Sequence, residues 1–357
     1  MTARRVLHIL PHAGGGAQTF IDVLDELDGY TFETIELSAS RSAAAAAMSV
    51  AERQPALFRA ARRADIIHCH GEMASLLSLP VLAGRPSVTI VHGLHLLRRL
   101  GPGAPQRLGQ AGMWTIAAAA NRVVCSSEAE RDDLGFLPGR LRAKLVVVRN
   151  TVPLPPPPDP AARAAARAGL GLADDAVAVL YLGQLEPRKD PLTAARAAIH
   201  AHARNARIAL LIAGDGPQAA ELDMLSGPAV RLLGQRRDVS ALLAAADVFV
   251  MPSHREGMSF AVLEALAHGV ASVVADGSGN PEAVGDAGLV FAAGDDEQLA
   301  TLLLRLAGDP AERAALGAAG RARMEDELTT QRFLDGMRAV YDSVLTGPDR
   351  GAGAGPV

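Results

Sequence analysis

The stretch DVFVMPSHREGMSFAVLEALAHG, Asp247 to Gly269, contains a complete strand, loop and helix. Its start, DVFVMPS, is rich in apolar and β-branched residues and predicts a buried strand. FAVLEALAHG then predicts a helix of about nine residues, with Gly269 suited to the left-handed position that follows a helix end. The loop between them carries Glu256, and Glu264 lies about one turn into the helix. The segment therefore places two carboxylates just beyond the carboxyl end of a strand.

The same strand and helix alternation runs through the whole chain. Segments between the predicted strands carry apolar residues three and four positions apart, and the alanine-rich stretch 42–51 predicts a short helix. This alternation predicts an α/β fold with parallel sheets covered by helices on both faces. The predicted strands are 5–10, 64–70, 87–93, 121–127, 144–150, 176–183, 207–214, 229–234, 247–253, 270–276 and 288–291.

The length of the chain indicates two domains. Its 357 residues exceed the roughly 250–300 at which one hydrophobic core usually splits. After Asn150 comes TVPLPPPPDP, a proline-rich run that cannot donate sheet hydrogen bonds and suits an extended connector. We predict an N-terminal Rossmann-like domain (1–152), a linker (153–165), a C-terminal Rossmann-like domain (166–328), an amphipathic helix (329–345) and a disordered tail (346–357).

Composition and charge narrow the possible functions. The chain is 49% hydrophobic and 21% charged, as in ordinary globular proteins. Residues 1–150 carry 17 basic and 13 acidic groups and the remainder 18 and 26, so the net charge of −4 divides into +4 and −8. A net charge of only +4 on residues 1–150, together with an aromatic content of 3%, argues against nucleic-acid binding.

A few local features of the sequence indicate where in the cell the protein is expected to lie. The N-terminal apolar run is interrupted by His8, Pro11 and His12, so no signal peptide is expected, and no run is long enough to span a bilayer. Both cysteines lie in predicted strands, which favours a reducing cytoplasm over a disulfide framework. Ordinary solvated helix faces account for the paired arginines of the N-terminal half, with peripheral contact to the inner membrane face as the alternative. These arginines are Arg62, Arg63, Arg98 and Arg99.

The loop HREGMS suits a ligand with sugar on both sides of a phosphate. The backbone amides of Met258, Ser259 and Phe260 lie at the positive end of the predicted helix, which attracts an anion such as a diphosphate. A carboxylate accepts paired hydrogen bonds from vicinal hydroxyls, and Glu256 and Glu264 flank this anion site. A nucleotide sugar has that layout.

The string PSHREGMSFAVLEALAHGV resembles the Glu-x7-Glu signature of retaining family 4 glycosyltransferases. The resemblance implies a GT-B fold, two Rossmann-like domains facing a central cleft, with the donor bound in the C-terminal domain and the terminal helix packed back on the N-terminal one. It further implies that Glu264 binds the ribose hydroxyls and that Glu256 contacts the transferred sugar near the reacting carbon. The other donor-binding residues expected here are Gly257, Met258, Ser259 and Phe260.

A second loop, YLGQLEPRKDP (181–191), offers charge to a leaving diphosphate. Arg188 and Lys189 would stabilise the negative charge that develops as the glycosidic bond breaks. Lys189 matches the family pattern, whereas the usual arginine is replaced by Gln184, which can donate a hydrogen bond but brings no charge. We expect Arg188 to substitute for it.

Two further segments are expected to contribute from the N-terminal domain. PHAGGGAQTF (11–20) lacks the third glycine of a dinucleotide fingerprint, but Gly15 and Gly16 allow close backbone approach to donor phosphate and acceptor. His92 ends the predicted strand SVTIVHG, and the resemblance implies that it contacts the donor sugar, with His95 as a less favoured substitute.

The remaining motifs give weaker signals. The family resemblance places the backbone of Leu233, Gly234 and Gln235 around the nucleotide base and makes the turn AGDGP (213–217), with Asp215, chiefly structural. His68, Cys69 and His70 superficially resemble metal ligands, but adjacent strand residues point to opposite faces and no second cluster accompanies them, so no metal site is expected. No Asp-x-Asp triplet is present, consistent with a transferase that uses neither metal nor cofactor.

These features together predict a retaining glycosyltransferase that moves a sugar from a nucleotide-sugar donor, with UDP favoured, to a hydroxyl acceptor. The acceptor would be a glycan, a glycolipid or a small-molecule precursor. Three alternatives stay open: a GDP-mannose-type mannosyltransferase, a nucleotide-sugar-binding protein made catalytically weak by Gln184, and a pyridoxal-phosphate phosphorylase. The last needs a Schiff-base lysine, and the chain has only Lys144 and Lys189.

Overall fold

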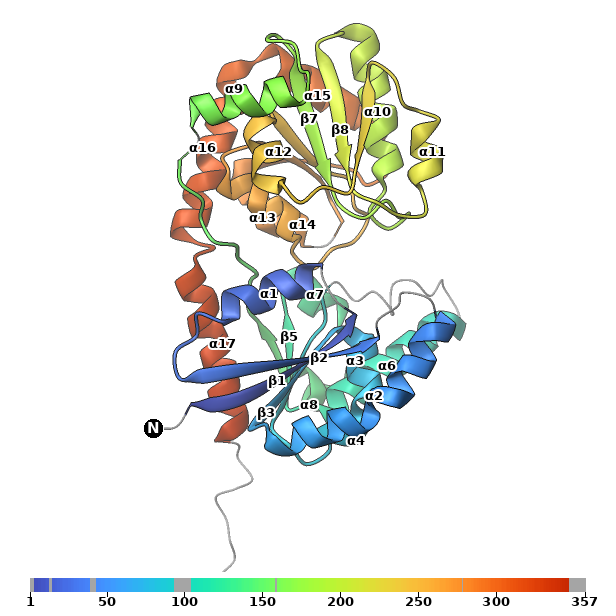
Figure 1. The fold of residues 1–357 in the computed structure, drawn as a ribbon, viewed down its shortest axis with the longest axis vertical. Helices are drawn as coiled ribbons and strands as arrows, with labels where there is room; N and C mark the ends of the chain where they lie inside the picture. Colours follow the sequence, from blue (N-terminus) through green and yellow to red (C-terminus); the bar gives the residue numbers. More distant parts are fainter. Residues whose placement is uncertain are drawn as a thin grey trace, which may run out of the picture. The chain divides into compact units, whose positions relative to one another are not determined.

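The computed structural model describes residues 3–12, 15–38, 43–92, 104–157, 159–277 and 279–346 (Figure 1). It divides into two compact units. Unit 1 comprises Met1–Asn150 and Thr330–Val357, and unit 2 comprises Thr151–Thr329. His95 and residues 347–357 of the expected tail lie outside the described residues.

Unit 1 is built on a six-stranded sheet whose strands are all parallel. The strand order, β2-β1-β3-β4-β5-β6, is the flavodoxin-like order with one strand added at its end. In such sheets ligands bind at the carboxyl ends of the strands, where the order reverses, which here is between β1 and β3. The strands are β1 (Arg4–His12), β2 (Tyr30–Ser38), β3 (Ile66–His70), β4 (Ser87–Ile90), β5 (Arg122–Cys125) and β6 (Leu145–Val147).

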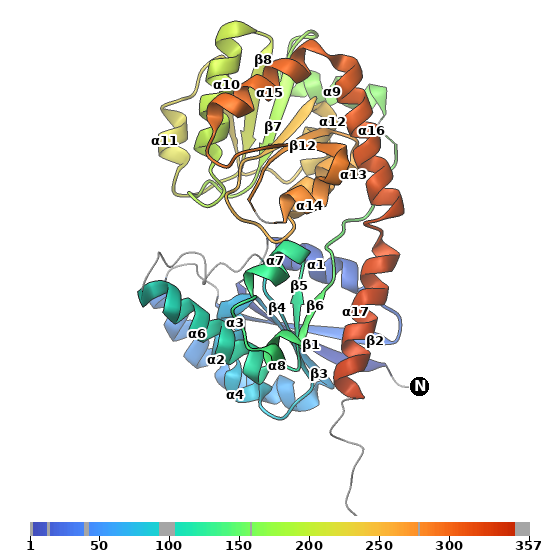
Figure 2. The ribbon, with the colours of Figure 1, turned by 180° about the vertical axis from the view of Figure 1, so that it is seen from behind.

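Helices cover both faces of this sheet because its strands are apolar on both sides. Leu7 and Ile9 pack into a core with residues of α2 and α3, whereas His8, between them, lies on the side of α1 and α17. Figure 2 shows α17 running alongside the strands of unit 1. The helices are α1 (Gly16–Leu24), α2 (Ala43–Arg63), α3 (Gly71–Leu77), α4 (Leu79–Leu82), α6 (Ala104–Ala119), α7 (Glu128–Asp133), α8 (Gly139–Arg142) and α17 (Thr330–Leu345).

Strand β2 was not predicted from the sequence. Its residues YTFETIELS carry apolar side chains at Tyr30, Phe32, Ile35 and Leu37, and β2 pairs only with β1 at the edge of the sheet. Because Glu33 and Thr34 are adjacent polar residues, these apolar positions form neither a continuous run nor a strict alternation. The sequence pattern therefore did not mark β2 as a strand.

Unit 2 contains a second parallel six-stranded sheet, in the order β12-β11-β10-β7-β8-β9. Numbered within the unit, this is the Rossmann order 3-2-1-4-5-6, and the order reverses between β7 and β10. The loops that follow these two strands are therefore expected to meet beside a ligand site. The strands are β7 (Val177–Leu182), β8 (Ile208–Ala213), β9 (Val230–Gly234), β10 (Val248–Met251), β11 (Ala271–Ala275) and β12 (Gly288–Phe291).

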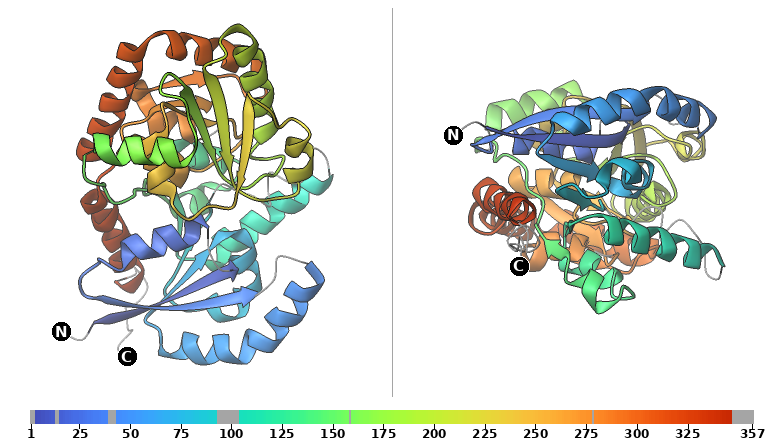
Figure 3. Two further views of the ribbon diagram at one scale, coloured as in Figure 1. Left: turned by 45° about the horizontal axis from the view of Figure 1, so that its top comes forward. Right: turned by 90° about the horizontal axis from the view of Figure 1, so that it is seen from below.

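Two hydrophobic cores lie on opposite faces of the unit 2 sheet. One is formed with α10 and α15, and the other with α12, α13 and α14. Figure 3 shows α9, in green, and α10, in yellow-green, on different sides of the strands. The helices are α9 (Pro160–Gly169), α10 (Pro191–Arg204), α11 (Ala219–Asp223), α12 (Val239–Ala245), α13 (Phe260–Ala267), α14 (Asn280–Val284), the 3-10 helix η1 (Gly285–Ala287), α15 (Asp296–Gly308) and α16 (Pro310–Asp326).

The expected linker, 153–165, ends earlier than the sequence suggested. Helix α9 begins at Pro160, with the Asp159 carboxylate accepting a hydrogen bond from the amide of Ala161 at 2.9 Å. Arg163 and Arg167, one turn apart, then pair with Asp247 at 2.6 and 3.0 Å. The second half of the expected linker is thus a capped helix anchored to the start of β10, since alanine-rich sequence after a capping Asp-Pro favours a helix.

The terminal helix α17 is part of unit 1. Asp342 accepts hydrogen bonds from Arg4 and Tyr30, each at 2.8 Å, and the Tyr341 ring is fully buried beside the sheet. Cys69 and Cys125 are buried and form no disulfide. Among the described residues, no helix combines the length and apolar character that crossing a bilayer requires.

Candidate functional site

The loops after β7 and β10 are joined to each other at the carboxyl end of the unit 2 sheet. The amide of His254 donates to the carbonyl oxygen of Arg188 at 3.1 Å, and its Nε2 lies 3.0 Å from the Asp190 carboxylate. Asp190 has a left-handed backbone with φ 48° and caps α10 through the amide of Thr193. Because an aspartate at positive φ is uncommon, these contacts hold the first loop in one conformation.

Two cations of the first loop converge on a carboxylate of the second. Arg188 Nη1 lies 2.9 Å and Lys189 Nζ 2.5 Å from the same oxygen of Glu256, whose exposure is 7%. Arg188 also pairs with Glu186 at 2.8 Å, a residue that sequence analysis did not single out. The sequence thus identified both cations and Glu256, and the structure adds that they form one ion-paired cluster.

Glu264 has the opposite environment. It projects from α13, is half-buried, and its carboxylate makes no hydrogen bond or ion pair with any residue that the structure describes. Burial therefore raises the pKa of Glu264 to about 7. A desolvated carboxylate without a partner can accept hydrogen bonds from a ligand.

The first turn of α13 confirms the strand, loop and helix prediction. Ser259 precedes the helix, and Gly269 follows it with φ 70°. Of the three amides expected to attract an anion, that of Ser259 donates to Asn280 Oδ1 at 3.3 Å. Met258 is buried and Phe260 is half-buried.

The turn AGDGP supports the loop after β7. The amide of Leu185 donates to the carbonyl of Asp215 at 3.0 Å, and the Asp215 carboxylate accepts from its neighbour Gly216 at 2.8 Å, so its role is structural. Gln184 is exposed, and its carbonyl accepts from the buried Tyr181 hydroxyl at 2.8 Å.

Of the residues expected around a nucleotide base, Leu233 is half-buried, whereas Gly234 and Gln235 are exposed at the end of β9. The carbonyl of Gly234 accepts a hydrogen bond from the amide of Gly214 at 2.9 Å. The structure thus brings this strand end next to the AGDGP turn of the same unit.

Replacing Gly214 with alanine is expected to destabilise unit 2. The added Cβ would lie 1.8 Å from the carbonyl oxygen of Gly183, a backbone atom that cannot move aside without displacing the loop. Such overpacking typically costs about 1–3 kcal/mol or more, and urea unfolding would measure it. Gly227→Ala is the matched control, since nothing lies within 4 Å of its Cβ position. Equal stability of the two variants would contradict this account.

A second set of predicted residues lies in unit 1. Gly15 precedes α1 with φ 76°, and both Gly15 and Gly16 are exposed after β1. His92 follows β4 with φ 47°, a left-handed conformation that a histidine adopts only at some energetic cost. His92 Nε2 lies 3.1 Å from His70 Nδ1.

The structure corrects the reasoning about His68 and His70. Strand alternation separates both from Cys69, but residues two apart share a face, and His8 of β1 joins them there. His8 Nδ1 and His70 Nε2 are already hydrogen-bonded at 2.7 Å, and the rings of His68 and His70 stack with centroids 4.5 Å apart. Both ring nitrogens of His70 already lie in hydrogen bonds, to His8 and to His92, and these contacts would compete with metal ligation.

The sequence missed His8 and the role of His70 behind His92. All four histidines lie in apolar surroundings, and burial lowers the pKa of His8 to about 3 and that of His92 to about 4. Burial likewise holds the pKa values of His68 and His70 well below the usual range. All four imidazoles are therefore neutral near pH 7.

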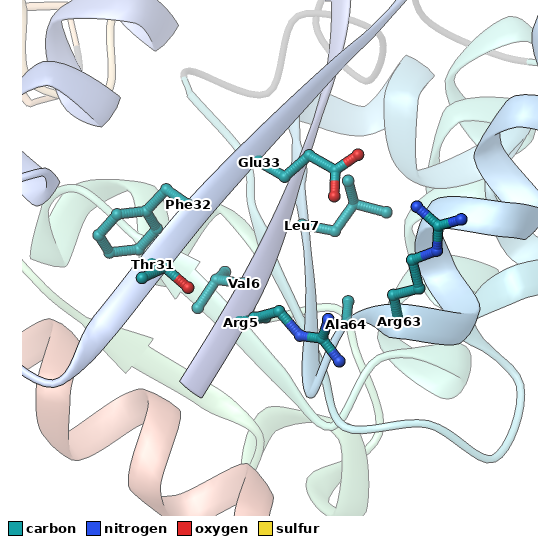
Figure 4. Close-up of a pocket in the computed structure, with 8 residues that line it drawn as sticks. All are labelled: Arg5, Val6, Leu7, Thr31, Phe32, Glu33, Arg63 and Ala64. Atoms are coloured by element: carbon teal, nitrogen blue, oxygen red, sulfur yellow. The ribbon is translucent and has the colours of Figure 1, made fainter. Parts of the chain in front are cut away.

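Unit 1 also contains a small cavity between β1, β2 and the end of α2 (Figure 4). It measures about 70 Å³ and is lined by the amino-terminal halves of β1 and β2, with Arg5, Glu33 and Arg63 as its charged residues. Ligand pockets usually measure about 300–1,000 Å³ and, in open α/β sheets, lie at the carboxyl ends of the strands. This cavity is therefore not the candidate site.

Two family models match the chain. One, described as Glycosyltransferase Family 4, matches residues 38–154, and the other, Glycosyl transferases group 1, matches residues 176–309. The first lies almost entirely in unit 1 and the second entirely in unit 2.

Curated relatives and solved structures agree with these matches. D-inositol 3-phosphate glycosyltransferase of Kineococcus radiotolerans is 30% identical over 299 residues, 74% of this chain and 68% of the relative. A GDP-mannose-dependent phosphatidylinositol monomannoside mannosyltransferase of Corynebacterium glutamicum is 36% identical over 171 residues, 44% of this chain and 45% of its own length.

The same fold occurs in two solved structures. The sucrose-phosphate synthase of Thermosynechococcus elongatus has a TM-score of 0.80 at 20% identity, covering 96% of this chain and 99% of that one. Anabaena HepE in complex with UDP-glucose has a TM-score of 0.76 at 19% identity, covering 96% and 100%.

Proposed function

Because the chain belongs to the family 4 glycosyltransferases, hexosyltransferases of the GT-B fold, we propose that it transfers a sugar from a UDP-sugar to a hydroxyl acceptor with retention of anomeric configuration. The proposal covers the donor nucleotide, the stereochemistry and the residues that carry the reaction. HepE, a structural neighbour, has been solved with UDP-glucose, which supports UDP. The C. glutamicum relative depends on GDP-mannose, which makes GDP the donor nucleotide to test against it.

One observation carries the site assignment, the convergence of Arg188 and Lys189 on Glu256 where the strand order of unit 2 reverses. In the free protein each cation neutralises a carboxylate. A bound diphosphate brings negative charge to the same position, so Arg188 and Lys189 can bind its oxygens instead. They then stabilise the charge that accumulates on the leaving diphosphate as the glycosidic bond breaks.

Glu256 has a role that depends on this exchange. Its carboxylate is nearly buried, and its ion pairs with two cations fix it in place. When Arg188 and Lys189 bind the diphosphate instead of Glu256, the Glu256 carboxylate can accept hydrogen bonds from hydroxyls of the transferred sugar. In the proposed complex its negative charge also stabilises the positive charge that develops at the reacting carbon. No carboxylate nucleophile is needed if the leaving diphosphate accepts the acceptor's proton on the same face of the sugar.

We assign Glu264 the role of binding the ribose hydroxyls of the donor. Its carboxylate, which has no partner among the described residues, lies about one turn into α13, while the start of that helix favours the diphosphate. Two vicinal hydroxyls can donate to its two oxygens and replace the water lost on burial. The backbone at Leu233 to Gln235 is assigned to the base, and Gly15, Gly16 and His92 to the donor phosphate and sugar. Neither a metal ion nor a cofactor is part of this proposal.

Nucleotide binding tests the donor assignment directly. Thermal-shift measurements with UDP, GDP, ADP and TDP are expected to give a selective increase in Tm with UDP, because one base fits the end of β9 best. Hydrolysis of UDP-sugars without acceptor, and transfer to candidate hydroxyl acceptors, would follow.

Glu264→Ala should abolish the shift, whereas Glu297→Ala, at the exposed start of α15, should leave it unchanged. A selective shift with GDP would replace the proposed nucleotide. No shift and no hydrolysis with any nucleotide or donor would contradict the transferase assignment.

A further inference from the structure

Three imidazoles of unit 1 form a hydrogen-bonded chain that ends at His92. His8 Nδ1 lies 2.7 Å from His70 Nε2, and His70 Nδ1 lies 3.1 Å from His92 Nε2. His8 is fully buried and the exposure of His70 is 1%. The three imidazoles thus form a buried row of hydrogen-bonded rings that leads to His92.

Phe20 of α1 packs against one side of the hydrogen-bonded imidazoles. Its ring meets those of His70 and His92 edge to face, at centroid distances of 5.5 and 5.6 Å, and meets Phe333 of α17 at 4.9 Å. The rings of His70 and His92 are nearly parallel, 20° apart. The position of His92 is therefore fixed by packing as well as by its hydrogen bond.

The proton positions in the chain are coupled. A neutral imidazole has one N–H and one lone pair, so both hydrogen bonds of His70 must run in the same direction. Either all three rings carry their proton on Nδ1, or all three carry it on Nε2. The second arrangement would leave a buried N–H at His8 Nε2, an atom with no hydrogen-bond partner in the structure.

The first arrangement is favoured because an orphaned buried N–H is rarer and costlier than an unpaired acceptor. It runs from His8 Nδ1–H to His70 Nε2 and from His70 Nδ1–H to His92 Nε2. His92 then keeps its proton on Nδ1, the one ring nitrogen not occupied by His70.

We propose that His70, supported by His8, is a positioning residue that holds His92 in the Nδ1–H tautomer, so that His92 donates a hydrogen bond to an oxygen of the bound donor sugar. The contact with the sugar rests on the proposed transferase function. The tautomer does not, because it follows from unit 1 alone. No proton is transferred in this role, and His70 itself does not touch the substrate.

The tautomer can be measured on the full chain without any substrate. In long-range ¹H–¹⁵N spectra of protein labelled at its histidine nitrogens, His92 should show a protonated Nδ1 and an unprotonated Nε2 near pH 7, with its signals assigned by their loss in His92→Asn. His70→Leu removes the Nδ1–H that donates to His92 Nε2. His92 should then no longer be held in the Nδ1–H tautomer. His70→Asn places an amide N–H near the position of Nδ1 and should preserve it.

His68→Leu is the matched control. His68 is as buried as His70 and stacks on it, but it is hydrogen-bonded to the Tyr341 hydroxyl at 2.8 Å and not to His92. It should perturb stability like His70→Leu while leaving the His92 signals unchanged. A wild-type His92 protonated on Nε2, or one unaffected by His70→Leu, would overturn the proposal.

Kinetics test the consequence for the sugar. Loss of one well-oriented hydrogen bond predicts that His70→Leu lowers kcat/KM by roughly five- to tenfold, with His70→Asn and His68→Leu within about twofold of wild type. An unchanged kcat/KM in a His70→Leu protein with an altered tautomer would overturn the contact with the sugar. Absence of any transferase activity would instead refute the proposed function, and the spectra of the wild-type protein would still decide the tautomer.

Discussion

Replacing both Arg188 and Lys189 with alanine is expected to lower kcat/KM by about 10² to 10⁴, the largest effect predicted for this site. Each cation is proposed to make a charge-assisted hydrogen bond to the leaving diphosphate, worth about 1.5–3 kcal/mol. Two such bonds together correspond to this range of rates. Steady-state kinetics with the preferred donor would measure the loss, which should appear mainly in kcat if the bonds strengthen in the transition state.

The single variants should reveal coupling between the two cations. Arg188 and Lys189 contact the same oxygen of Glu256, so removing one allows the other to adjust, and the two losses should not simply add. Lys144→Ala is a useful control, because Lys144 belongs to unit 1 and donates to three backbone carbonyls at the end of α6. It should lower Tm without changing kcat/KM well below Tm. Wild-type kinetics in the double variant would remove the observation on which the proposed site rests.

Glu264→Gln is expected to weaken nucleotide binding by about 10- to 100-fold, from the loss of one or two hydrogen bonds to a charged acceptor. The same variant should be more stable than wild type at pH 8. The reason is that the wild-type protein must hold a half-buried charge there, whereas glutamine is neutral. Calorimetric binding of UDP and thermal unfolding of the same samples would show both effects.

The pH dependence gives the sign of this second effect. The folded-state pKa of Glu264 is about 7 and its ordinary value is 4.5. Below pH 4.5 the group is protonated in both folded and unfolded states, so it has no effect on the difference between the proteins. Between pH 4.5 and about pH 7, Glu264 is ionised in the unfolded chain but still largely protonated in the folded protein. The stability of the wild-type protein therefore declines as pH rises through this range. The advantage in Tm of Glu264→Gln should therefore grow between pH 5 and pH 8, then level off.

The nucleotide affinity of the wild-type protein should rise with pH, whereas its stability falls. Above pH 7 the Glu264 carboxylate is ionised and can accept both ribose hydroxyls, so wild-type affinity should rise with pH, while that of Glu264→Gln should stay nearly constant. Glu297→Gln is the matched exposed control and should change neither profile. An equal pH dependence in wild type and Glu264→Gln would show that this carboxylate does not hold the ribose.

The sequence alone was sufficient for the fold class, and it singled out most residues of the proposed unit 2 site. Alternating apolar runs and helical patterns predict parallel sheets because burial on both faces demands continuous apolar strands. Strand β2 escaped this criterion because polar residues interrupt its apolar positions. Glu256, Lys189 and Glu264 could be identified because they stand within long motifs whose spacing places them on a loop and a helix after a strand.

The tertiary structure alone decided how those side chains are paired and charged. Spacing along the chain cannot show that Arg188 and Lys189, more than 60 positions before Glu256, share one of its oxygens, because strand order brings their loops together. Nor can it show that Glu264 is half-buried without a partner among the described residues, and burial is what raises its pKa. The histidine chain arises in the same way: alternation puts His68 and His70 on one face, but only the pairing of β1 with β3 adds His8 and directs the chain to His92.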